Sequence, residues 1–152
     1  MAQTASVTVK IVNRGKFALP EYKTPGSAGC DLYANLDNPL EIKPMQRVLI
    51  PTGLFMELPL GYEAQVRARS GLALKHGIGV LNSPGTIDAD YRGEIQIILI
   101  NLSTETYTLH PGERIAQLIV AAVCKAEWIE TETLNLTERG EGGFGSTGIK
   151  TS

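Results

Sequence analysis

Short apolar runs recur along this chain, with Gly- or Pro-containing turns between them, at spacings of roughly eight to twelve residues. This pattern predicts strands at residues 7–11, 28–34, 40–42, 47–50, 52–58, 62–69, 77–81, 95–100 and 106–109, and in the long apolar run 115–129. The sixteen glycines and eight prolines among 152 residues favour the same turn-rich architecture. The sequence therefore predicts an all-β fold, either a sandwich or a barrel.

The length suits a single domain with a real core, because two domains of half this size would each be marginal. Only residues 70–75 look helical, and Ser70 is a good N-cap for them. From Thr137 onward the core-forming pattern stops and glycines dominate. We therefore predict one domain over residues 1–136, followed by a flexible glycine-rich C-terminal arm at residues 137–152.

Composition narrows the class of protein. The formal net charge of −2 and the pI near 5.7 disfavour a nucleic-acid-binding surface, which would want a basic face. Apolar segments of membrane-spanning length are absent, and the N-terminal residues lack the pattern of a signal peptide. Cys30 and Cys124 lie within apolar stretches, which favours two buried free thiols. We expect a cytoplasmic protein that binds neither membrane nor nucleic acid.

The segment 81–93 separates the two apolar runs 77–81 and 95–100, which predicts a hairpin with an elaborate tip. A simple hairpin turn needs about two to five residues. This tip is longer, and it carries Asn82, Asp88, Asp90, Tyr91 and Arg92. On composition alone a solvated loop is the ordinary interpretation, and presentation of polar groups to a ligand is the alternative.

Three further features bear on chemistry. Asp31 lies inside a short apolar strand, where an acid ordinarily marks a strand end that faces water. The sequence Arg69-Ser70-Gly71 opens the predicted helix and suits an anion such as phosphate, although on these residues alone an ordinary capped helix with a surface arginine is the better explanation. Gln117 lies between apolar neighbours, so it is either a buried hydrogen-bonding side chain or part of a strand's outward face.

The C-terminal arm has two interpretations as well. Glycine-rich tails are commonly disordered, but Arg139, Phe144 and Ser146 together would supply a phosphate clamp, a stacking ring and a hydroxyl on a mobile lid. The chain contains no GxxxxGK[ST] loop, which excludes a P-loop enzyme. His76 and His110 lack metal-ligand spacing, which disfavours a zinc site.

Five segments, taken together, resemble the five ordered motifs of trimeric deoxyuridine triphosphatases (dUTP pyrophosphatases). They are AGCDL at 28–32, RSGLA at 69–73, GTIDADYRG at 85–93, PGERIAQ at 111–117 and RGEGGFGSTG at 139–148. Each motif alone is weak, but five in order at the family's spacing are specific, and they span nearly the whole chain. Ala68 stands where many members have proline, which affects the approach to Arg69 and little else.

The resemblance implies a jelly-roll fold and a homotrimer whose three active sites lie at subunit interfaces, with each arm closing over a neighbouring chain. It implies Mg²⁺-dependent hydrolysis of dUTP to dUMP and pyrophosphate, which keeps uracil out of DNA and supplies dUMP for thymidylate synthesis. Asp88 would deprotonate the water that attacks the α-phosphorus. Asp31 would hold the magnesium ion through one of its waters.

The resemblance also implies the substrate contacts. They are Arg69, Ser70, Gly71, Asn82, Thr86, Ile87, Asp88, Tyr91, Gln96, Gln117, Arg139, Phe144, Gly145 and Ser146. The hairpin tip would read the uracil edge with its backbone and with Asn82, and Tyr91 would pack against the deoxyribose and leave no room for a 2′-hydroxyl. Phe144 would stack on the uracil, while Arg139 and Ser146 would meet the γ-phosphate.

Two alternatives share this scaffold: a deoxycytidine triphosphate deaminase, which attacks the base, and a non-catalytic nucleotide-binding regulator. The glycine-rich arm and the Asp88/Tyr91 hairpin favour the hydrolase over the deaminase. A catalytically dead relative would be expected to have lost Asp88, Tyr91 or Phe144, and all three are present.

Overall fold

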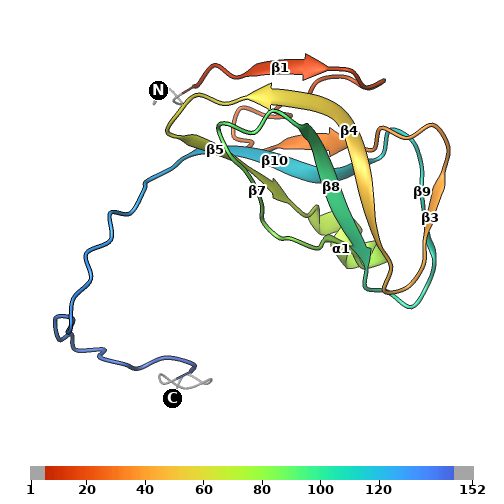
Figure 1. The fold of residues 1–152 in the computed structure, drawn as a ribbon. Coiled ribbons are helices and arrows are strands. Elements are labelled where there is room, and N and C mark those ends of the chain that lie inside the picture. Colours follow the sequence, from red (N-terminus) through yellow and green to blue (C-terminus); the bar gives the residue numbers. More distant parts are fainter. Residues whose placement is uncertain (1–5, 146–152) are drawn as a thin grey trace.

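Two four-stranded antiparallel sheets and a two-stranded ribbon make up the body of the protein in a computed structural model that describes residues 6–145 (Figure 1). The first sheet has the order β1-β4-β8-β6, the second β2-β10-β5-β7, and β3 pairs with β9. The strands are β1 (Lys10–Asn13), β2 (Cys30–Tyr33), β3 (Leu40–Ile42), β4 (Arg47–Glu57), β5 (Tyr62–Arg67), β6 (Ile78–Val80), β7 (Gly85–Ile87), β8 (Glu94–Asn101), β9 (Tyr107–Leu109) and β10 (Arg114–Ala122), and the helix α1 is Ser70–His76.

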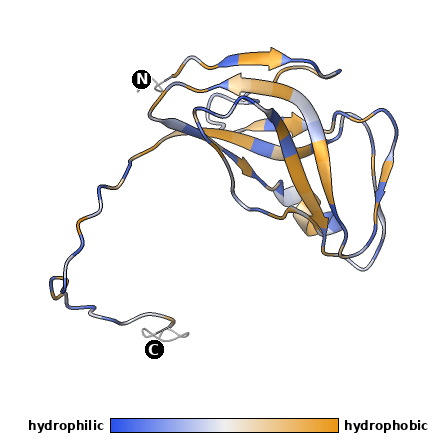
Figure 2. Ribbon diagram, in the orientation of Figure 1, coloured by the Kyte–Doolittle hydropathy of each residue, from blue (hydrophilic) through white to orange (hydrophobic). Residues whose placement is uncertain are grey.

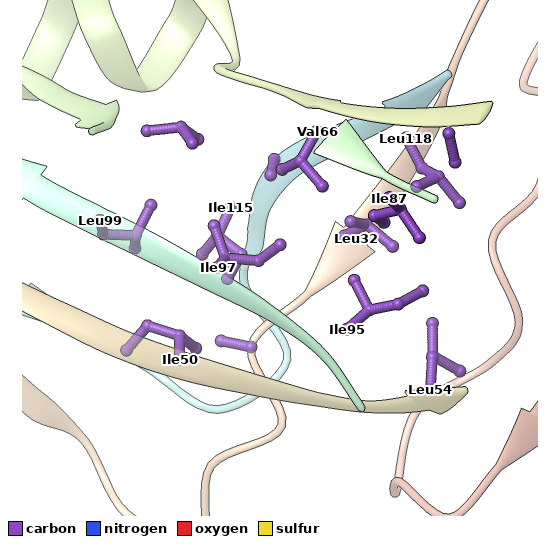
Figure 3. Packing of buried hydrophobic residues seen from close by; sticks show 14 of the residues in the cluster. Leu32, Ile50, Leu54, Val66, Ile87, Ile95, Ile97, Leu99, Ile115 and Leu118 are labelled. Carbon is purple, nitrogen blue, oxygen red and sulfur yellow. The ribbon is translucent and has the colours of Figure 1, made fainter. Parts of the chain in front are cut away.

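The core lies between the two sheets, and period-two alternation fills it. On β8, Ile95, Ile97 and Leu99 are almost fully buried, and they face side chains of the second sheet such as Leu32 and Val66 (Figure 3). Alternating strands of this kind bury one face each, which is the pattern of a two-sheet sandwich. The all-β prediction is confirmed, in the jelly-roll-like form and not as a closed barrel.

Residues 47–50 and 52–58, predicted as separate strands, belong to one eleven-residue strand, β4. Pro51 cannot donate to a sheet ladder, and the pairing of β4 with β8 shifts register between Pro51 and Phe55. Within this irregular stretch the Thr52 side chain still links β4 to β8, because its Oγ1 donates to the carbonyl oxygen of Ile95 at 2.6 Å. A bulge thus replaces the predicted turn.

The last strand is shorter than the apolar run 115–129 predicts. β10 ends at Ala122, and the following segment leaves the body in extended form (Figure 1). Trp128, Ile129, Leu134 and Leu136 are 83–99% exposed there, and Figure 2 shows hydrophobic residues along this segment. Nothing among residues 6–145 pairs with it as a strand.

Two local predictions need correction. Cys124 lies in this extended segment and is exposed, whereas Cys30 is buried as predicted, and burial raises the pKa of the Cys30 thiol. In α1 the N-cap is Arg69 rather than Ser70, and it makes no side-chain capping bond. Within residues 6–145, the structure has no helix long and apolar enough to span a membrane.

Candidate active site

The hairpin tip connects the two sheets. At its base β6 pairs with β8, and the Leu81 N–H donates to the carbonyl oxygen of Ile98 at 2.9 Å. The chain then turns through a cis Ser83–Pro84 peptide bond and forms β7, which pairs with β5 of the second sheet. The predicted hairpin is confirmed, and its tip is a bridge between sheets instead of a free loop.

This bridge encloses a cavity of about 270 Å³ between the tip, β8 and β5. Six of the residues that the sequence assigns to the substrate line it, namely Asn82, Thr86, Ile87, Asp88, Tyr91 and Gln96. Leu49, Val66, Gly85 and the β8 residues 94, 95, 97 and 98 complete the lining. We call this cavity the hairpin pocket.

The side chains around the hairpin pocket have different roles. Ile87 is 7% exposed and belongs to the core, so only its backbone is available to a ligand. Asp88 directly follows β7 and is exposed, and within residues 6–145 its carboxylate accepts no hydrogen bond. Tyr91 N–H donates to the Asp88 carbonyl oxygen at 3.1 Å, which closes the turn between them. The free carboxylate is therefore presented at the rim of the cavity.

Tyr91 is held in place although it is 45% exposed. Its hydroxyl donates to the carbonyl oxygen of Glu94 at 3.0 Å. Nη1 of Arg92 donates to the carbonyl oxygens of Ala89 at 2.7 Å and of Tyr91 at 3.0 Å. Oε1 of Glu94 accepts from the Gly53 N–H at 2.8 Å. The tip is thus tied to itself and to the bulge of β4, which preorganises the pocket wall.

A second cavity, of about 420 Å³, lies where β2, β10 and the start of α1 meet. Lys23, Tyr33, Arg69, Leu72, Gly112, Glu113 and Arg114 line it. Three of these side chains are cationic and one is anionic, which suits an anionic ligand. We call this cavity the arginine corner. It shares no lining residue with the hairpin pocket.

Asp31 does not line the arginine corner, but its carboxylate contacts the two arginines that do. Its Oδ1 accepts from Nε of Arg69 at 2.9 Å, and its Oδ2 lies 3.3 Å from Nη1 of Arg114. Nη1 of Arg69 in turn donates to the Arg114 carbonyl oxygen at 3.0 Å. Asp31 is only 8% exposed, so the ordinary interpretation of an acid that faces water is wrong here. Its charge is balanced by the two arginines instead.

Gln117 lies beside this network. On β10 it stands opposite Asp31 of β2 and Arg67 of β5. Residues directly opposite each other in neighbouring strands point to the same face of a sheet, and the adjacent Leu118 points into the core. Gln117 is half-buried, so of the two alternatives the outward face is the correct one.

The turn before β10 is fixed by a tyrosine. The Tyr107 hydroxyl donates to Oε2 of Glu113 at 2.7 Å, and burial together with the Glu113 carboxylate raises the pKa of Tyr107. The ring of His76, the last residue of α1, packs 5.0 Å from the ring of Tyr107. The turn and the helix therefore support the arginine corner from two sides.

Ser70 and Gly71 are exposed at the start of α1, next to Arg69. The described arm residues lie away from the body of the protein (Figure 1): Arg139 Nε donates to the Gly142 carbonyl oxygen at 2.8 Å, Phe144 is fully exposed, and Gly145 is exposed too. Ser146 lies outside the described residues. Neither cavity has a lining residue from the described part of the arm.

The side chains that could ligate a metal ion limit the kind of metal binding that is feasible. Residues 6–145 hold no group of three or more His, Cys, Asp or Glu side chains that could ligate an ion. Asp31 is a single acid whose oxygens each keep a lone pair beside their arginine contact. Such a group fits Mg²⁺ held through water, because Mg²⁺ retains several waters and takes substrate phosphates as ligands.

The sequence does not predict every residue that lines the two cavities. Arg114 lies within the PGERIAQ motif, but Gln117 is the only predicted substrate residue of that motif. The partner of Arg114 is Asp31, which is 83 residues away. Lys23 lies in a polar turn that has no distinctive pattern. For Arg114, a cation within a matched motif was a usable signal, and for Lys23 the sequence offers none.

A family model described as dUTPase matches residues 15–148. The chain is 52% identical over 142 residues to the deoxyuridine 5'-triphosphate nucleotidohydrolase of Fusobacterium nucleatum, a match that covers 93% of this chain and 97% of that relative. It is 57% identical over 143 residues to the protein of the same name from Cytophaga hutchinsonii, covering 94% of this chain and 93% of that protein.

Solved structures agree with the fold. A dUTPase variant of Staphylococcus bacteriophage 80alpha with dUpNHpp superposes with a TM-score of 0.81 at 25% identity, covering 95% of this chain and 100% of that one. A variant dUTPase of phage phi11 of S. aureus, described as revealing the coordination of a structural Mg(II) ion, superposes with a TM-score of 0.76 at 20% identity, covering 86% of this chain and 100% of that one. The latter supports the fold alone.

Proposed function

Since the chain belongs to the dUTPase family, we propose that it hydrolyses dUTP to dUMP and pyrophosphate and thereby lowers the dUTP available to DNA synthesis while supplying dUMP. The observation that carries this proposal is the hairpin pocket, which gathers six predicted substrate residues around one cavity. A narrow β-bridge of this kind offers backbone donors and acceptors to the edge of a base, and Asn82 adds an amide.

In the proposed mechanism, Asp88 takes a proton from a water whose oxygen attacks the α-phosphorus. The new P–O bond forms as the bond from the α-phosphorus to its bridging oxygen breaks, and pyrophosphate leaves. A general base of this kind is typically worth ~10²–10⁴ in rate. The exposed Asp88 carboxylate, with no hydrogen-bond partner among residues 6–145, is available for that role.

The arginine corner is the proposed site of the phosphate chain. Arg69 and Arg114 are oriented by Asp31, Ser70 and Gly71 begin the adjacent helix, and Gln117 shares the outward face. Asp31 would hold one of the waters of a magnesium ion bound with the substrate, and the ion would neutralise charge on the phosphates. We expect chelation to abolish turnover and added Mg²⁺ to restore it.

Specificity follows from the same pocket. The backbone of Thr86 and Ile87 with Asn82 would read uracil, and a cytosine, whose donors and acceptors are reversed, would leave buried polar groups unpaired. Rejection of that kind can reach ~10⁴–10⁵. Tyr91, fixed by Glu94 at the cavity wall, would pack against the deoxyribose and exclude a 2′-hydroxyl, and Gln96 lines the same pocket.

A homotrimer with composite sites is part of the proposal. The two cavities share no lining residue, and the segment after β10 exposes large apolar side chains that would need cover from another chain. The arm, residues 137–152, would close over a neighbour's site and bring Phe144 to the uracil and Arg139, Gly145 and Ser146 to the phosphates. A cytoplasmic location also stays part of the proposal, because two free cysteines suit a reducing compartment.

The experiment offers dUTP, dTTP, dCTP and UTP separately to the purified protein with Mg²⁺, and follows both pyrophosphate release and base identity. Pyrophosphate from dUTP alone is the expected result. Conversion of cytosine to uracil in dCTP would favour the deaminase alternative, and tight dUTP binding without product would favour the non-catalytic regulator.

A further inference from the structure

Gly93, the last residue of the hairpin tip, lies against the hydroxyl end of the Tyr91 ring. A Cβ atom at position 93 would lie 2.5 Å from Cζ and 2.8 Å from Cε2 of that ring, and closer still to the hydroxyl oxygen. Carbon atoms in proteins do not approach so closely without a shift. The ring therefore occupies its observed place only because residue 93 has no side chain.

The neighbouring contacts fix the backbone on which the ring rests. Glu94 accepts the Tyr91 hydroxyl with its carbonyl oxygen and is itself tied to the Gly53 N–H through Oε1. Nη1 of Arg92 donates to the carbonyl oxygens of Ala89 and Tyr91. When the backbone is held and a side chain is added at position 93, the end of the Tyr91 side chain is the part that can move.

We propose that Gly93 is a specificity-positioning residue, which sets the distance at which the Tyr91 ring meets the sugar of the bound nucleotide. This inference rests on the proposed function. Tyr91 forms part of the wall of the hairpin pocket, whereas Gly93 does not line it. A methyl group at position 93 therefore acts on the sugar only through the ring.

The test compares Gly93→Ala with Gly26→Ala, a control at a glycine where an added Cβ meets nothing within 4 Å. The measurement is kcat/KM for dUTP and for UTP. We expect Gly93→Ala to lower the preference for dUTP over UTP by about 10- to 100-fold, the scale of a misfitted pocket contact. The control keeps the preference, and both variants keep a cooperative thermal transition.

A second pair of variants separates the ring from other effects of the substitution. In a Tyr91→Ala background no ring meets the new methyl group, so Gly93→Ala should change the preference no further. If Gly93→Ala fails to fold but the double variant folds, the ring contact is equally supported.

Two results would overturn the inference: an unchanged preference in folded Gly93→Ala, or an equal change in the Tyr91→Ala background. A wild-type protein without dUTP hydrolysis would instead contradict the proposed function itself, so the two failures are distinguishable.

Discussion

The hairpin pocket and the arginine corner differ in how they are built. The hairpin pocket is formed by a tip whose backbone bridges two sheets, and hydrogen bonds between near neighbours such as Tyr91 and Glu94 hold it. The arginine corner is formed by charged side chains from distant parts of the chain, and its key contact joins Asp31 to Arg114.

The difference indicates a division of labour. A rigid wall of backbone and apolar strands suits recognition of a flat base with fixed donors and acceptors, whereas a cationic corner suits a flexible, highly charged phosphate chain. Both are present on one chain but do not share a lining residue. We propose that each chain supplies two half-sites, which are joined between neighbouring chains.

The largest expected effect comes from the arm, whose described residues line neither cavity. Removal of residues 138–152 should lower kcat/KM for dUTP by about 10³-fold or more, in the range of a delivered arginine. The thermal midpoint should stay nearly unchanged, because the described arm residues pack on nothing in the body. Normal turnover by the truncated protein would show that the arm takes no part in dUTP hydrolysis.

The next effect concerns the hairpin pocket. Asp88→Asn should lower kcat by ~10²–10⁴, because the amide cannot accept the proton of the attacking water. Nucleotide binding should remain measurable by calorimetry. Asp90→Asn is the matched control, since Asp90 lies in the same turn but does not line the cavity. Equal losses in the two variants would contradict a specific role for Asp88.

A smaller effect is expected at the arginine corner. Asp31→Asn removes the charge that orients Arg69 and Arg114, and such misplacement can cost ~10² in kcat/KM. The Mg²⁺ concentration that gives half-maximal rate should rise as well. Asp37→Asn, at an exposed acid paired with Lys16, is the control. Unchanged Mg²⁺ dependence would show that Asp31 has a structural role only.

The smallest effect is on stability. Thr52→Val removes the buried hydrogen bond to the Ile95 carbonyl oxygen and should lower the free energy of unfolding by about 1–2 kcal/mol. Thr108→Val, at an exposed strand position, should cost less. Equal denaturation midpoints for the two variants would show that the Thr52 hydrogen bond contributes little to stability.

Much of the fold follows from the sequence because short apolar runs between turn residues mark most strands locally. β8 was predicted almost to the residue, since the apolar run 95–100 lies within it. The short strand β7 was missed, because its pairing with β5 is a long-range contact that no local pattern records. The run 115–129 was overextended, because its apolar residues beyond Ala122 pair with no strand among residues 6–145.

The candidate site was predictable only in part: the sequence indicates its local features but not the contacts between distant residues. The composition of the tip indicated a polar presentation, and the family resemblance assigned Asn82 and Tyr91 to the pocket that they do line. Partners far apart in sequence, such as Arg114 for Asp31, required the pairing of β2 with β10. The dependence of Tyr91 on Gly93 required coordinates, because a glycine in a turn ordinarily reflects backbone freedom and not space for a ring.

The central claim is that a working site combines the hairpin pocket of one chain with the arginine corner of another. Mixing Asp88→Asn with Arg69→Gln and allowing the subunits to exchange tests it directly, since each variant alone lacks one proposed half of the site and is expected to be nearly inactive. Random trimers would carry both intact halves at about a quarter of the sites. We expect recovery of dUTP hydrolysis toward that fraction, and a mixture no more active than its separate components would contradict a site composed from two chains.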